Sequence, residues 1–99
     1  MDESHDTRLM INGRVQGVGY RAWLAQEAQR RGLRGWVRNR ASGAVEARLI
    51  GPKPAVEDMI AACHRGPAAA RVERVEVLPP GDAAMDPGAA TAFTVRPTL

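Results

Sequence analysis

Cysteine and long hydrophobic runs are scarce in this sequence, and each scarcity excludes a class of protein. Cys63 is the only cysteine, so the chain can form neither an internal disulfide nor a cysteine-based metal cluster. No apolar run approaches the roughly 20 residues of a membrane-spanning helix, and the N-terminal MDESHDTR is polar and partly acidic, unlike a secretory signal. We therefore expect a cytoplasmic protein without membrane association and without a metal site.

Positive charge is concentrated in the first half of the chain. Residues 1–50 carry nine Arg against five Asp and Glu, a net charge of +4, whereas residues 51–99 are close to neutral. Such a bias suits an anionic partner, either a small phosphate or carboxylate ligand or a nucleic acid backbone. A basic surface without any ligand has the same charge, so charge alone leaves both interpretations open.

Apolar residues recur with alternating or helical spacing along most of the chain, and this spacing predicts its strands and helices. Val56, Met59, Ile60 and Cys63, for example, form the apolar stripe of a helix. The expected elements, in order, are a strand over 8–13, a helix from Tyr20 to Gly32, hairpin strands over 33–39 and 44–50, a helix ending before Gly66, a strand over 72–78 and a short strand over 93–96.

This order predicts an α+β fold, a ferredoxin-like α/β sandwich. It consists of βαββαβ plus a short C-terminal strand, with two helices on one face of an antiparallel sheet. The length suits a single domain, 1–99, in which we expect 1–7 to be disordered and 79–91 to form a long loop. RNA-recognition domains share such sheets but stack bases on aromatic residues of the central strands. The expected strands 8–13 and 44–50 contain no aromatic residue, so we expect no nucleic acid binding.

The stretch GRVQGVGYR, residues 13–21, combines three glycines with two arginines between the first strand and the first helix. It is not a nucleoside-triphosphate P-loop, because no Lys-Ser or Lys-Thr pair follows. The letters half-match a dinucleotide fingerprint, but that motif needs an acid about 20 residues on. This chain has Arg38-Asn39-Arg40 there.

A simpler anion site fits the stretch better. Gly17 and Gly19 permit the positive φ values of a turn whose backbone N–H groups converge at a helix N-terminus, where an anion is favoured. Arg21, in the first turn of the expected helix, offers a planar guanidinium that can bind two phosphate oxygens. The sequence therefore predicts a site for one phosphate group.

GRVQGVGYR is followed by GWVRN, SGAVE and then RGPAAARVERVEV, and together these segments closely resemble the acylphosphatase family. The resemblance runs from about Leu9 to Phe93 and implies the ferredoxin-like fold already predicted from the order of elements. It further implies metal-independent, cofactor-free hydrolysis of the carboxyl-phosphate bond of an acyl phosphate, which yields a carboxylate and inorganic phosphate.

The resemblance also implies roles for individual residues. Arg21 and Asn39 are the expected catalytic residues, with Arg21 on the phosphate and the Asn39 amide on the attacking water. The backbone N–H groups of the glycine-rich loop, residues 15–20, are expected to bind the phosphate; its members are Val15, Gln16, Gly17, Val18, Gly19 and Tyr20.

The expected partners are a small acyl phosphate and inorganic phosphate, the latter as product and inhibitor, and we expect a monomer. One alternative is a nonenzymatic nucleic-acid-binding module, which the placement of the aromatics disfavours. Another is an acylphosphatase-like subunit of a larger maturation enzyme that handles carbamoyl phosphate.

Overall fold

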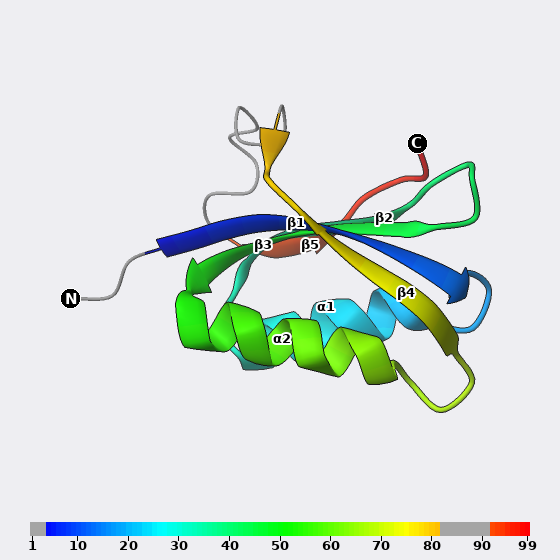
Figure 1. The fold of residues 1–99 in the computed structure, drawn as a ribbon, viewed down its shortest axis with the longest axis horizontal. Helices are drawn as coiled ribbons and strands as arrows, with labels where there is room; N and C mark the ends of the chain where they lie inside the picture. The colour runs from blue at the N-terminus through cyan, green and yellow to red at the C-terminus, as the bar shows by residue number, and fades with distance from the viewer. Residues whose placement is uncertain (1–3, 82–91) are drawn as a thin grey trace.

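The computed structural model describes residues 4–81 and 92–99 (Figure 1). Their elements, in chain order, are β1 (Ser4–Arg14), α1 (Tyr20–Arg30), β2 (Arg34–Asn39), β3 (Val45–Pro52), α2 (Lys53–Arg65), β4 (Arg71–Leu78) and β5 (Phe93–Val95). The strands form one sheet in the order β4-β1-β3-β2-β5, and both helices cover the same face of it (Figure 1). This arrangement confirms the predicted ferredoxin-like α+β fold.

The direction of the strands decides which loops meet at one end of the sheet. β1 and β2 both pair antiparallel with β3, so β1 and β2 run parallel to each other and end on the same side. β4 is antiparallel to β1, whereas the short β5 pairs in parallel with β2. The C-terminal ends of β1 and β2 therefore lie at the same end of the sheet.

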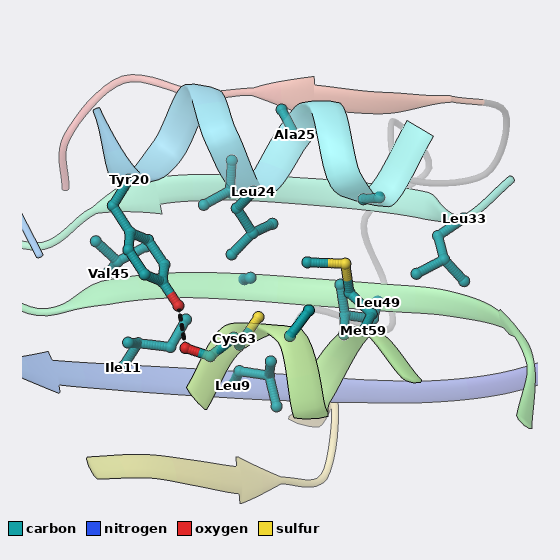
Figure 2. Packing of buried hydrophobic residues seen from close by; sticks show 14 of the residues in the cluster. Leu9, Ile11, Tyr20, Leu24, Ala25, Leu33, Val45, Leu49, Met59 and Cys63 are labelled. Carbon is teal, nitrogen blue, oxygen red and sulfur yellow. Dashed lines mark hydrogen bonds between the residues drawn. The ribbon is translucent and has the colours of Figure 1, made fainter. Parts of the chain in front are cut away.

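Apolar side chains fill the space between the helices and the sheet (Figure 2). Leu9 and Ile11 come from β1, Leu24 from α1, and Met59 from α2, and all four are fully buried. Ile60, expected in the core stripe of the second helix, is only partly buried and packs against the edge of this cluster. The apolar spacing of the sequence thus identified the faces of the elements that meet.

Both ends of α1 have a glycine with positive φ. Gly19 precedes the helix with a φ of 79°, and Gly32 follows it with a φ of 70°. At the C-terminal end, the N–H of Gly32 donates to the carbonyl of Gln29, and the N–H of Leu33 donates to that of Ala28. This bonding is a Schellman motif, which explains why the helix ends there.

The first strand begins earlier than predicted. Residues 4–7, expected to be disordered, belong to β1 and pair with residues 49–52 of β3. Their side chains add contacts, because the Thr7 hydroxyl donates to the Leu78 carbonyl at 3.0 Å and Asp6 pairs with Arg48. Of the predicted disordered segment, residues 1–3 lie outside the described residues, as do residues 82–91 of the predicted long loop.

On the face of the sheet away from the helices, alternate residues of β2 and β3 form a polar cluster. Trp36 is buried there, with the guanidinium groups of Arg38 and Arg96 lying 4.6 and 5.2 Å from its ring centre. Glu46 is also buried and pairs with arginines from neighbouring strands. The outward direction of these side chains follows the predicted alternation, but the burial of a carboxylate among them was not predicted.

Candidate functional site

The glycine-rich loop, residues 15–20, connects the end of β1 to the start of α1. Gly17 and Gly19 adopt φ values of 75° and 79°, in the left-handed region that the sequence predicted for them. Gly19 occupies the N-cap position of α1, where no side chain caps the first turn, and that turn contains no acidic residue. The first N–H groups of a helix have no partner within it, so this end of α1 favours an anion.

Pairing within the sheet places Asn39 close to this loop. Asn39, the last residue of β2, pairs with Val45 of β3, and Val45 pairs on its other side with Ile11 of β1. The strand β1 ends shortly after Ile11, and the loop begins at Val15. Asn39 therefore lies across the sheet from the start of the glycine-rich loop.

Arg21 and Asn39, which are distant in sequence, line the same small open pocket of about 240 Å³. Its described lining comprises Val15, Gly17, Gly19, Tyr20, Arg21, Ala22, Asn39 and Val95. The structure thus brings together six of the eight residues expected at the site. Gln16 and Val18 are not among the described lining residues, although both belong to the loop.

Two lining residues, Ala22 and Val95, were not predicted. Ala22 directly follows Arg21 on α1, so its position could have been inferred once Arg21 was placed. Val95 belongs to β5, and it reaches the site only because β5 pairs in parallel with β2. No local pattern in the sequence indicates that pairing, because a strand of three residues is too short for its apolar alternation to show which strand it pairs with.

Asn39 has an unused hydrogen-bond acceptor. Its side-chain Oδ1 is buried and has no hydrogen-bond partner among the residues that the structure describes. Its backbone carbonyl, in contrast, accepts from the N–H of Leu99 at 3.1 Å. Buried polar atoms in folded proteins are nearly always paired, with protein, ligand or water. An unpaired amide oxygen at a pocket is therefore suited to hold a water molecule or a substrate.

Arg21 has an unusual electrostatic position. It lies in the first turn of α1, where the helix dipole disfavours a positive charge. It forms no ion pair within residues 4–81 and 92–99, whereas Arg30 and Arg31 at the other end of α1 both bind Glu27. An anion in the pocket would compensate both the guanidinium charge and the positive end of the helix.

The described lining residues offer no group for proton transfer near neutral pH. Tyr20 lines it, but the hydroxyl points into the core and donates to the Cys63 carbonyl at 2.7 Å (Figure 2). Burial and the neighbouring Cys63 raise the pKa of that hydroxyl far above its usual range. Burial likewise raises the pKa of the Cys63 thiol to about 12. Among the described lining residues there is no Asp, Glu, His or Lys.

Neither a metal centre nor a membrane span is found in the part of the chain that the structure describes. Within it, no three His, Cys, Asp or Glu side chains gather where they could hold a metal ion. Its helices are also too short or too polar to cross a bilayer.

Comparison with known proteins gives a consistent result. The acylphosphatase family model matches residues 7–86. An acylphosphatase from Rhodopseudomonas palustris is 66% identical over 68 residues, which cover 69% of each chain. One from Azorhizobium caulinodans is 53% identical over 96 residues, covering 97% of this chain and 99% of the relative. The crystal structure of acylphosphatase from Bacillus subtilis matches with a TM-score of 0.82 at 31% identity, covering 95% of this chain and 99% of that one.

Proposed function

The chain belongs to the acylphosphatase family and is an acylphosphatase, and from this premise we propose how its residues divide the reaction. The glycine-rich loop and Arg21 bind the phosphate of an acyl phosphate, and Asn39 holds the attacking water. The observation that carries this division is the shared pocket, where an arginine without an ion pair among the described residues lies with an unpaired amide oxygen at a helix N-terminus.

The phosphate group is the part of the substrate that the pocket fits best. Backbone N–H groups at the start of α1 and the guanidinium of Arg21 supply hydrogen bonds and positive charge where the phosphoryl oxygens would lie. In phosphoryl transfer the protein contributes mainly positioning and charge stabilisation. A binding site built from fixed donors is suited to both tasks.

In the proposed reaction, the water held by Asn39 attacks phosphorus in line with the bond to the carboxyl oxygen. That bond breaks, its electron pair leaves with the carboxylate, and a substrate phosphate oxygen takes the proton of the water. Because the acid of the leaving group has a pKa of about 4 to 5, like the side chains of Asp and Glu, it leaves without protonation. The weakly basic leaving group and the proton-accepting phosphate oxygen together account for a pocket without a general acid or base among its described residues. A carboxylate that leaves without protonation also supports a metal-independent mechanism.

The acyl group would extend from the phosphate toward the apolar part of the lining, formed by Val15, Ala22 and the half-exposed Val95. An aryl acyl phosphate such as benzoyl phosphate is therefore a suitable test substrate. Inorganic phosphate, which shares the bound group, should inhibit competitively. A cytoplasmic location and a monomeric state remain predictions from the sequence.

The division of roles is tested by assaying benzoyl phosphate hydrolysis in EDTA for the wild type, Arg21→Gln and Asn39→Ala. Loss of one preorganised hydrogen-bonding group costs about 10² to 10³ in rate when that group is an oxyanion donor, and we expect the guanidinium of Arg21 and the amide of Asn39 to matter as much, so each variant should lose at least about 100-fold in kcat/KM. Arg21→Gln should also weaken inhibition by phosphate, whereas Asn39→Ala should leave it nearly unchanged.

Arg30→Gln is the matched control, since it removes an exposed arginine from the opposite end of the same helix. It should keep wild-type activity. Folded Arg21 or Asn39 variants that hydrolyse the substrate as fast as this control would disprove the proposed roles. A wild type that is inactive in EDTA and restored by a metal ion would disprove metal independence.

A further inference from the structure

Gln16 belongs to the glycine-rich loop, but its side chain contacts the hairpin between β2 and β3 instead of lining the pocket. The side-chain Nε2 donates to the Arg40 carbonyl at 2.8 Å and to the Ala44 carbonyl at 2.7 Å. A neutral amide nitrogen has two hydrogens, and both find an acceptor here. Both side-chain donors of Gln16 therefore bind a segment that follows it by more than twenty residues.

The two acceptors lie at the two ends of one tight turn. The N–H of Arg40 donates to the Ala44 carbonyl at 2.8 Å, and the N–H of Gly43 donates to the Arg40 carbonyl at 3.0 Å. Each carbonyl thus accepts one bond within the turn and a second from Gln16. This turn begins directly after Asn39, and Val45, the partner of Asn39 in the sheet, directly follows Ala44.

We propose that Gln16 is a positioning residue that sets the distance between the phosphate-binding loop and Asn39. The inference rests on the proposed function, in which phosphate and attacking water are held by different segments. Around Gln16, Gly17 and Gly19 make the loop backbone permissive, so side-chain bonds are needed to define its place. Gln16 fastens this loop to the hairpin beside the residue that holds the water.

The position of the water relative to phosphorus is sensitive to small shifts. A displacement of about 1 Å can cost on the order of 100-fold in rate when reacting groups must align. Phosphate binding itself depends on the loop and on Arg21, which directly follows the loop in the first turn of α1. Loss of the Gln16 bonds should therefore lower kcat while leaving phosphate affinity nearly intact, a pattern that a purely structural role would not give.

The experiment compares wild type, Gln16→Met, Asn39→Ala and the double variant with benzoyl phosphate in EDTA. Methionine has similar length and no donor. We expect Gln16→Met to lower kcat about tenfold or more, with the inhibition constant of phosphate changed by less than about twofold. In the Asn39→Ala background the same substitution should cost less than about threefold, because the group it positions is absent.

Gln16→Ser leaves space for water to solvate both carbonyls and replaces Gln16→Met in the experiment if the methionine variant folds poorly. It should likewise lower kcat and leave the inhibition constant of phosphate nearly unchanged. Thr7→Val removes a side-chain bond to a carbonyl at the opposite end of β1 and should leave kcat unchanged. Equal losses with and without Asn39, or a parallel loss of phosphate affinity, would overturn the inference. If the proposed function is wrong, the single variant Asn39→Ala should keep full activity. That result would overturn the inference as well, and it is distinct from the two outcomes above.

Discussion

Glu46 is a carboxylate with only 2% of its side chain exposed, held by three arginines on the open face of the sheet. Arg38 lies 2.8 Å from it, and Arg8 and Arg40 lie 3.1 Å from it. Burial alone would raise the pKa of Glu46, but hydrogen bonds from Arg38 and Arg8 and the charge of Arg40 outweigh it and lower the pKa. Arg38 and Arg40 flank Asn39 in the chain, so their ion pairs with Glu46 also help to hold the end of β2 in place.

Glu46 should therefore make stability depend on pH in the acid range. Its lowered pKa in the folded state means that its contribution is fully present above the unfolded value of 4.5 and is lost as pH falls through the folded value. At pH 7, Glu46→Gln should cost about 1 to 3 kcal/mol of unfolding free energy, less than a fully buried pair because the arginines are partly exposed. Urea unfolding of both proteins between pH 7 and pH 3 measures this difference.

The difference between wild type and Glu46→Gln should shrink below pH 4.5. Asp58→Asn is a suitable control, because Asp58 also pairs with an arginine but its side chain is 66% exposed. It should have little effect at any pH. A Glu46→Gln difference that is constant from pH 7 to pH 3 would contradict the account of this cluster.

This cluster also illustrates a limit of prediction at the level of single residues. Alternation along β2 correctly indicated that Trp36 and Arg38 leave the helix-covered face. It did not indicate that Glu46, on the neighbouring strand, would be their buried partner, since cross-strand contacts depend on the register between strands. Arg21 was singled out by a glycine-rich motif at a helix start, whereas the role expected of Asn39 came from the family resemblance, because its place near the loop depends on strand pairing.

The helix α1 offers a direct test of the loop, because similar glycines lie at its two ends. Gly19 and Gly32 have φ values of 79° and 70°, and an added Cβ would meet no atom within 4 Å at either position. Alanine at each should therefore cost a similar amount of stability, about 1 to 2 kcal/mol from backbone strain alone. Only Gly19→Ala should alter phosphate binding, because only Gly19 lines the pocket.

We expect Gly19→Ala to raise the inhibition constant of phosphate about tenfold, equivalent to about 1.4 kcal/mol of lost binding. Gly32→Ala should leave that constant unchanged. Inhibition assays on both variants, together with urea unfolding, separate the two effects. Equal phosphate inhibition of the two alanine variants would show that the loop conformation at Gly19 does not contribute to binding.

Most elements could be predicted from periodicity, whereas their partners and ends could not. Val72, Val75 and Val77 do not share one parity in the sequence, which points to a bulge or to a later strand start, and the register between β1 and β4 does shift at Asn12/Gly13. The extension of β1 to Ser4 had no such signal, because its polar residues are ordered by pairing with β3. The same holds for β5, whose parallel pairing with β2 brings Val95 to the pocket.

At the scale of the whole molecule, the topology explains how a few residues from distant parts of the chain can form one site. Two parallel strands, β1 and β2, flank β3 and end at the same side of the sheet, which brings the glycine-rich loop next to Asn39. The helix that follows the first strand then directs its N-terminus at the same point. In the proposed mechanism, the fold thus supplies the positioning, and the side chains of Arg21 and Asn39 supply a charge and an amide.

The central claim is that the loop holds the phosphate while Asn39 directs water at phosphorus. It is tested most directly by hydrolysing benzoyl phosphate with the enzyme in ¹⁸O-labelled water containing EDTA and locating the label by mass spectrometry. After subtraction of the uncatalysed reaction, the account predicts one ¹⁸O atom in the released phosphate and none in benzoate. Label in benzoate would mean attack at the carbonyl carbon and would contradict the account.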